Sequence, residues 1–235
     1  MTIKIAKDLI MKLISSWSGG KDSCLALFKA IQQGYEISVL LNFISGEYKR
    51  CCFHGISNEL INLQSEAIQI PIVQKSVPAD MKGYETQFKL AVNELKKRKI
   101  QGMVFGDIYL EEHKNWVDRV CNDMEITPIE PLWNLPAEKV VKDFIDNGFK
   151  AIVISAKADL FEEGILGREI NYELIHEIKK KNICCCGENG EFHTFVYDGP
   201  IFKKKIIINK TEKILKKGFW KHWFLDIKNY KIEQK

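Results

Sequence analysis

The residues with the clearest chemical potential form a turn near the amino terminus, which reads Ser-Gly-Gly-Lys-Asp-Ser from Ser18 to Ser23. Its glycines let the backbone turn tightly and approach a ligand without an intervening Cβ. A helix is expected to begin near Asp22, so its free N–H groups and the positive end of its dipole would face the turn. Lys21 adds a positive charge. The turn therefore predicts a phosphate site built by Ser18, Gly19, Gly20, Lys21, Asp22 and Ser23.

This turn differs from two well-known phosphate-binding loops. Residue 15 is a serine where the Walker A pattern needs its first glycine, and the dinucleotide fingerprint Gly-x-Gly-x-x-Gly is absent. A simpler interpretation is an ordinary strand–helix turn capped by Ser18 or Asp22. Glycines, a lysine and paired serines within one turn favour the phosphate-binding interpretation.

The segments around the turn predict an α/β domain with a parallel sheet. Strands that are almost entirely apolar alternate with segments of helical spacing, which is typical of a sheet with helices on both faces. We expect strands at residues 12–17, 37–44, 70–77 and 102–106, and helices at residues 22–31, 57–67, 84–98 and 111–124. The carboxyl ends of parallel strands meet at one edge, where ligands bind.

The second half of the chain has a different pattern. Two prolines within residues 130–136 mark the best candidate boundary. We therefore expect a nucleotide-binding domain at residues 1–130 and a smaller, substrate-binding α+β domain at residues 131–235. The expected elements of the second domain are helices at 137–147 and 172–181, and β segments at 149–155, 192–197, 203–208 and 219–227.

A second group of polar residues lies between Cys186 and Pro200. A loop rich in donors and acceptors and anchored on a strand is a common way to present polar groups to a ligand. A glycine-rich hairpin with surface polar residues is the alternative. The candidate substrate-binding residues are Gly167, Arg168, Glu188, Asn189, Glu191, His193 and Thr194.

Several single residues have both a chemical and a structural interpretation. Asp22 and Asp107 could bind Mg²⁺ or act as helix caps. Arg168 could neutralise a phosphate or carboxylate, or form a surface ion pair with Glu169. Glu188 and Glu191 could bind an amine or orient ammonia, and His193 could act as a base or as hydrogen-bonded structure. The candidate catalytic residues are Lys21, Asp22, Ser23 and Arg168; Gly106, Asp107 and the weaker candidates His54 and Gly55 would line the nucleotide pocket.

The turn at Ser18–Ser23 resembles the PP-loop of the N-type ATP pyrophosphatases, which cleave ATP between the α- and β-phosphates. The pattern Gly-Glu-x-Gly-Glu-Phe-x-Thr-Phe-Val at residues 187–196, with Gly164–Arg168, resembles the diphthine–ammonia ligases, and the likeness covers almost the whole chain. It implies an adenine nucleotide α hydrolase-like (HUP) fold, use of ATP with Mg²⁺, activation of a carboxylate as an acyl-adenylate, and amidation by ammonia. In the ligases the carboxylate belongs to diphthine on elongation factor 2.

Other details are similar to a branch of related ATP pyrophosphatases that act on a different acceptor. These are Phe105–Ile108, His193 and Tyr197–Pro200. A small acid or a tRNA base as acceptor, and a non-catalytic adenine-nucleotide-binding protein, are the alternative functions. A tRNA-modifying enzyme would favour paired reactive cysteines or a stronger basic surface.

Composition limits the remaining function classes. The chain has 235 residues, 46% hydrophobic and 28% charged side chains and a formal charge of +4, as in ordinary globular proteins. Short lysine runs are more typical of solvated faces than of nucleic-acid contact, so we expect no stable nucleic-acid binding. No apolar run approaches the ~20 residues that span a bilayer. Charges interrupt residues 1–8, so we expect no signal peptide.

The cysteines predict a reducing environment. Seven are present, including the run Cys184–Cys186, and an odd number of partly adjacent cysteines is poorly suited to disulfides. We therefore expect a cytoplasmic protein with reduced thiols. No Cys-x-x-Cys pair supports a metal or sulfur-transfer role, so buried or spare thiols are favoured. Trp220 and Trp223 are interpreted as core or homodimer contacts.

Overall fold

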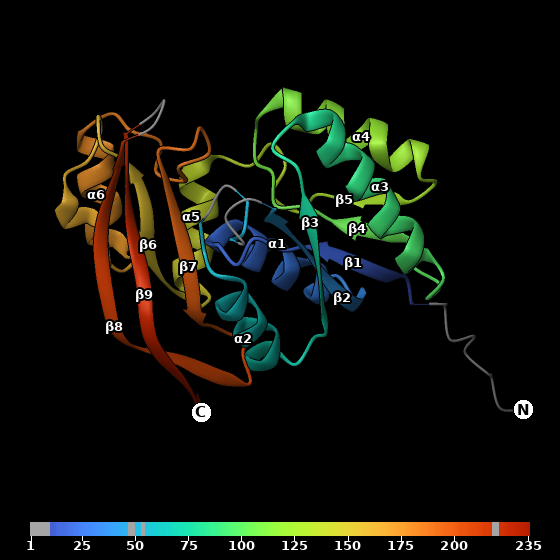
Figure 1. Ribbon diagram of the computed structural model, residues 1–235, viewed down its shortest axis with the longest axis horizontal. Helices are drawn as coiled ribbons and strands as arrows, with labels where there is room; N and C mark the ends of the chain where they lie inside the picture. Colours follow the sequence, from blue (N-terminus) through green and yellow to red (C-terminus); the bar gives the residue numbers. More distant parts are fainter. Residues whose placement is uncertain (1–9, 47–49, 53–54, 218–220) are drawn as a thin grey trace, which may run out of the picture.

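The computed structural model of the chain describes residues 10–46, 50–52, 55–217 and 221–235. The opening segment, His54 and Trp220 lie outside these ranges. The described chain forms two sheets with helices between and around them (Figure 1).

The first sheet is parallel and has five strands in the order β3-β2-β1-β4-β5. Its strands are β1 (Lys12–Ser16), β2 (Glu36–Ser45), β3 (Ile72–Val77), β4 (Gly102–Val104) and β5 (Thr127–Ile129). The helices that alternate with them are α1 (Lys21–Gln32), α2 (Asn58–Ile68), α3 (Met81–Lys96) and α4 (Glu111–Asp123). The predicted parallel α/β arrangement is confirmed. Strand β5 was not expected, because it is only three residues long and contains Pro128, which an edge strand tolerates.

Two apolar layers cover the two faces of this sheet. Neighbouring strand residues point to opposite faces, so Leu13 and Leu40 join the cluster that includes α1 and α2, whereas Ile14 and Leu41 join the cluster with α3 and α4. In Figure 1, α1 and α2 lie between the two sheets, and α3 and α4 cover the outer face. Helices on both faces explain why these strands are nearly all apolar.

The second sheet has four antiparallel strands, in the order β7-β6-β9-β8. Its strands are β6 (Lys150–Lys157), β7 (Phe192–Asp198), β8 (Lys204–Lys217) and β9 (Lys221–Gln234). The helices of this half of the chain are α5 (Ala137–Asp146), the 3₁₀ helix η1 (Glu163–Ile165) and α6 (Tyr172–Lys180). Trp223 is half-buried, and its indole N–H donates to the carbonyl oxygen of Phe161 at 3.1 Å.

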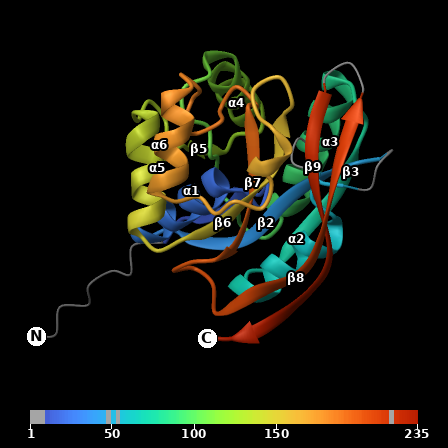
Figure 2. The ribbon, with the colours of Figure 1, turned by 90° about the vertical axis from the view of Figure 1, so that its left-hand side faces the viewer.

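Strands β8 and β9 are each 14 residues long, considerably longer than their expected segments. Five consecutive polar residues, Asn209–Lys213, interrupt the apolar runs of β8, and the register with β9 shifts within this stretch. That stretch lies on an exposed edge strand, so no buried face imposes a hydrophobic pattern on it. Figure 2 shows this long hairpin passing beside α2, where the N–H of Lys203 donates to the carbonyl oxygen of Ala67 at 2.7 Å.

The topology defines one position for a ligand. The strand order reverses at β1, with β2 on one side and β4 on the other. Parallel α/β sheets bind ligands at the carboxyl ends of the strands at such a reversal. The turn at residues 18–20 follows β1, and residues 105–110 follow β4, so the two segments flank this position. Within the described residues, no helix is both long and apolar enough to cross a bilayer.

Candidate active site

The glycine turn is held by a buried glutamine that the sequence analysis did not identify. Gln64 of α2 is completely buried, and its amide nitrogen donates to the carbonyl oxygens of Gly19 at 2.9 Å and Val196 at 2.7 Å. Its amide oxygen accepts from the indole N–H of Trp17 at 3.1 Å. The N–H of Val196 also donates to the carbonyl oxygen of Gly19 at 3.0 Å, which joins β7 directly to the turn. The turn is therefore fixed before any ligand arrives.

The backbone of the turn has the form that a phosphate site requires. Gly19 has φ of +77°, and Gly20 is the N-cap of α1 with no side-chain cap among the described residues. The alternative in which Ser18 or Asp22 caps the helix is therefore wrong. Instead, the Ser18 hydroxyl accepts from the N–H of Gly20 at 3.3 Å and donates to the Ser23 hydroxyl at 3.1 Å. The N–H of Lys21, the first residue of α1, is already taken by the Thr194 hydroxyl. No side-chain cap occupies the helix start among the described residues, so the N–H groups that follow Lys21 suit an anion.

Lys21 is buried and held by protein acceptors. It is 4% exposed, and its ammonium group donates to Asp22 Oδ2 at 2.7 Å and to the carbonyl oxygen of Cys186. Its backbone N–H donates to the hydroxyl of Thr194 at 3.0 Å. Burial by itself would lower the pKa of Lys21, but Asp22 and the other negative groups nearby outweigh burial and raise it. The lysine is therefore charged at neutral pH although it is buried.

Three carboxylates surround this lysine. Burial raises the pKa of Asp22, and the nearby charge of Asp107 adds to that rise. Burial also raises the pKa of Glu188, and the negative charge of Asp22 raises it further. The buried Oδ1 atom of Asp22 has no hydrogen-bond partner in the described part of the chain. Because these carboxylates repel one another when they are ionised, a cation that binds among them is stabilised.

The segment after β4 packs directly on the start of α1. A Cβ at Gly106 would lie 3.0 Å from both the carbonyl carbon of Asp22 and the nitrogen of Ser23, so only glycine fits without displacement. The next residue, Asp107, contacts His113 of α4, with 2.9 Å between Oδ1 and Nδ1. The position of Asp107 at the carboxyl end of β4 is as expected from the sequence.

This contact gives a testable pH dependence. The hydrogen bond to Asp107 raises the pKa of His113 above its ordinary value of about 6.5. Because the pKa is raised in the folded state, the contribution of the pair to stability is complete below about pH 6.5 and is lost as pH rises through the folded-state pKa. We expect an NMR titration of His113 to show a midpoint above about 6.5, and a lower midpoint in Asp107→Asn. An equal midpoint in the two proteins would contradict the assignment, and His113→Gln identifies the resonance.

The polar loop before β7 closes over the same position. Glu188 Oε1 accepts from the backbone N–H of Ile108 at 3.0 Å, and Asn189 donates to the hydroxyl of Tyr109 at 3.1 Å. Glu191 is 8% exposed, and Thr194 is 2% exposed. His193 is half-buried on β7, where it pairs with Ser155 of β6. The structure therefore brings Glu188, Asn189, Glu191 and Thr194 to the segments that follow β1 and β4.

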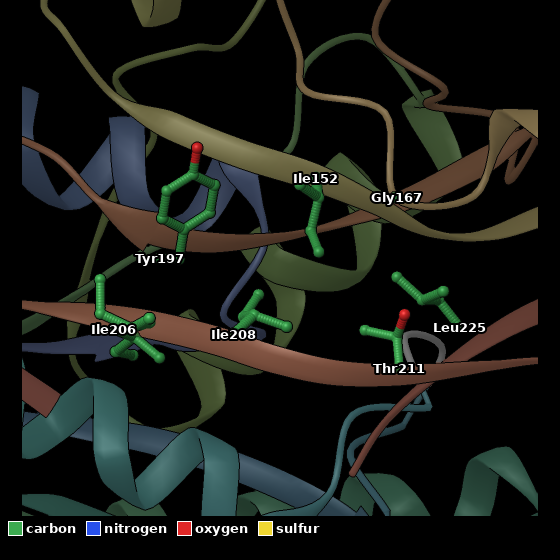
Figure 3. Close-up of a pocket in the computed structure, with 8 residues that line it drawn as sticks. Ile152, Gly167, Tyr197, Ile206, Ile208, Thr211 and Leu225 are labelled. Carbon is green, nitrogen blue, oxygen red and sulfur yellow. The ribbon is translucent and has the colours of Figure 1, made fainter. Parts of the chain in front are cut away.

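Two expected site residues lie elsewhere. The guanidinium of Arg168 forms a two-pronged ion pair with Glu177 of α6, at 2.5 and 2.7 Å. The predicted partner Glu169 instead binds Lys150 and Tyr197. Gly167 lines a largely apolar cavity of about 320 Å³ between the β6–β7 and β8–β9 pairs (Figure 3).

The amino-acid sequence matches known protein families over nearly its whole length. Residues 11–128 match the family described as the diphthamide synthase N-terminal domain, and residues 136–233 match the diphthamide synthase C-terminal domain. This chain belongs to the diphthamide synthase family. The predicted family is thereby confirmed.

Curated relatives of this family member carry the name diphthine–ammonia ligase. The zebrafish (Danio rerio) protein is 28% identical over 227 residues, covering 87% of this chain and 89% of the relative. The mouse (Mus musculus) protein is 28% identical over 228 residues, covering 87% and 85%. A crystal structure described as a predicted subunit of tRNA methyltransferase from Methanocaldococcus jannaschii covers 83% of this chain and 100% of that chain, at 16% identity and a TM-score of 0.42.

Two cysteines of this diphthamide synthase family member, Cys184 and Cys186, hold the loop before β7. All seven are free thiols. The Cys184 sulfur accepts from the hydroxyl of Tyr109 at 3.2 Å, and the Cys186 sulfur donates to the carbonyl oxygen of Ala137 at 3.0 Å. In the described residues, no group of three or more His, Cys, Asp or Glu side chains is arranged to hold a metal ion.

Proposed function

We propose that this chain is an ATP-dependent ligase that activates a carboxylate as an acyl-adenylate, releases diphosphate, and then joins the acyl group to ammonia with release of AMP. The observation that carries the proposal is the fixed glycine turn at the strand-order reversal, where charged Lys21 and three carboxylates meet. The relatives named diphthine–ammonia ligase support it. Diphthine on elongation factor 2 would then be the acceptor, and a chain acting on it would work in the cytoplasm.

The residues around the turn would have different roles in the reaction. The backbone of Ser18–Ser23 would bind the leaving diphosphate, and Lys21 would neutralise the charge that develops on it. Lys21 would first have to exchange its contacts with Asp22 and Cys186 for phosphate oxygens. Gly106 and Asp107 would line the nucleotide site from the segment after β4. Catalysis would consist mostly of positioning and charge stabilisation.

Mg²⁺ fits this site through the carboxylates. Asp22 has a buried carboxylate oxygen without a partner in the described residues, and Asp107 lies close enough to raise its pKa. Proteins usually bind Mg²⁺ through one or two carboxylates together with substrate phosphates. Adding Mg²⁺ with a non-hydrolysable ATP analogue will lower the pKa of His113, because a cation at Asp107 competes with the imidazolium. An unchanged titration would remove Asp107 from the metal site.

The acceptor would enter from the second domain. Glu188, Asn189, Glu191, His193 and Thr194 would face it from the loop and β7. Gly167 and Arg168 would contact it farther out, and Arg168 would have to leave Glu177 to reach a carboxylate or phosphate. In this proposal residues 1–130 bind ATP and residues 131–235 bind the acceptor. A homodimer would be compatible with this division.

The proposal is tested by product analysis. The chain is incubated with ATP, Mg²⁺, ammonium and elongation factor 2 that carries diphthine, and then with small carboxylates or tRNA in place of the factor. We expect equal amounts of AMP and diphosphate, and amide on the factor, only with the diphthine-bearing acceptor. Turnover with another acceptor would indicate a related pyrophosphatase. ADP as product, or bound ATP that is never cleaved with any acceptor, would overturn the proposal.

A further inference from the structure

Glu191 is a buried carboxylate that lacks a cation. It is 8% exposed, and none of the salt bridges among the described residues includes it. Its Oε1 atom accepts from the side-chain amide of Asn189 at 3.1 Å. Its Oε2 atom is buried and has no hydrogen-bond partner within the described ranges. A buried charge is costly unless it is paired, so this oxygen calls for a positively charged donor.

The surroundings hold this free oxygen in place. The amide nitrogen of Asn189 bonds both Glu191 Oε1 and the Tyr109 hydroxyl, at 3.1 Å each, and that hydroxyl donates to Cys184 at 3.2 Å. Lys157 lies beside this loop, but its ammonium donates to the carbonyl oxygen of Asn189 at 2.8 Å and forms no ion pair with Glu191 among the described contacts. Oε2 is therefore the acceptor that these contacts leave open.

The open oxygen lies beside the proposed adenylation site. Asn189 and Tyr109 connect it to the segment after β4, and the next residue, Phe192, has its ring 5.7 Å from the ammonium of Lys21. A small cation with N–H donors would supply both the charge and the hydrogen bond that this enclosed oxygen lacks. Ammonium has that size and charge, and it can donate to Glu191 while it approaches an acyl group.

We propose that Glu191 Oε2 binds the ammonium ion that supplies the amide nitrogen, an inference that rests on the proposed function. One ammonium proton passes to Oε2, and the nitrogen lone pair forms the C–N bond with the acyl carbon. The bond between that carbon and the AMP oxygen breaks, and AMP leaves with the bonding electrons. The second proton lost by the nitrogen passes to AMP or water. Asn189 and Tyr109 act as positioning residues.

Two reactions separate this inference from the proposed function. Exchange of labelled diphosphate into ATP needs the acceptor but no ammonium, so it reports adenylation alone. Amide formation at varied ammonium concentration, at ionic strength held constant with potassium chloride, reports the ammonium site. Glu191→Gln keeps the shape and removes the charge. Glu162→Gln, an exposed carboxylate, is the matched control.

We expect Glu191→Gln to raise the KM for ammonium about ten-fold or more, with diphosphate exchange within about two-fold of the unmodified chain. Glu191→Asp keeps the charge but moves it back by one methylene group, so its KM for ammonium should lie between those of the unmodified chain and Glu191→Gln. Glu162→Gln will change neither the KM for ammonium nor the diphosphate exchange. If Glu191→Gln retains diphosphate exchange and its KM for ammonium is unchanged, the ammonium site is overturned and the proposed function is not. Loss of exchange in Glu191→Gln and Glu191→Asp would also overturn the ammonium site, because Glu191 would then serve adenylation. No exchange in the unmodified chain would overturn both the site and the proposed function.

Discussion

Replacing Lys21 with alanine will lower AMP formation by about ten-fold or more, because the charge that neutralises the departing diphosphate is lost. The lysine is charged across the neutral range, since nearby carboxylates raise its pKa despite burial. The reduction in AMP formation should therefore be similar at all pH values near neutrality. AMP release with a saturating acceptor measures the effect.

The same substitution has a structural cost that must be separated from the chemical one. Alanine leaves the Cys186 carbonyl and the Asp22 carboxylate without their donor, at about 1–3 kcal/mol for a buried unpaired group. Lys21→Met keeps the apolar stem in place of a cavity while removing the charge. If both variants lose turnover to a similar degree but differ in thermal unfolding, the charge is responsible. Normal turnover in Lys21→Met would exclude Lys21 from the mechanism.

Gly19→Ala will abolish most of the AMP formation and lower stability by about 2 kcal/mol or more. Gly19 has φ of +77°, and an added Cβ would lie 2.4 Å from Gln64 Oε1 and 2.7 Å from Ile61 Cδ1. Neither neighbour can retreat easily, because Gln64 is buried and bonded to Trp17, Gly19 and Val196. The turn must move instead, and its N–H groups would lose their alignment toward the phosphates.

Gly34→Ala is the matched control for this substitution. Gly34 has φ of +90°, so alanine there meets a comparable backbone strain of about 1 kcal/mol. No described heavy atom lies within 4 Å of the added Cβ, and the residue lies beyond the far end of α1 from the turn. We expect a small loss of stability and normal AMP formation. Equal losses of activity in the two variants would contradict the steric account of Gly19.

The parts of the fold that the sequence predicted are those whose causes are local. Apolar runs of strand length and segments of helical spacing indicated the first sheet and its helices. The predicted helix at residues 57–67 has a local start signal of this kind, because the Ser57 hydroxyl caps α2 by accepting from the N–H of Leu60, three positions later, at 3.3 Å. The glycine turn was visible because its whole chemistry lies within six consecutive residues.

The parts that escaped prediction depend on contacts between distant segments. Gln64 looks like an ordinary polar residue of an amphipathic helix, yet its partners Trp17 and Val196 lie 47 and 132 positions away. Arg168 was assigned from its charge, but folding places it against Glu177. The Tyr109 hydroxyl gains its place only when Asn189, 80 residues later, folds over it.

By itself the amino-acid sequence determined the alternation of strands and helices in the first sheet apart from the short edge strand β5, the glycine turn and the family of this protein. Only the tertiary structure decided that Lys21 is buried between Asp22 and Cys186, and that Glu191 keeps one oxygen without a described partner. The reason is physical. Helix and strand patterns arise from neighbours along the chain, whereas burial and ion pairing depend on which distant groups exclude water together.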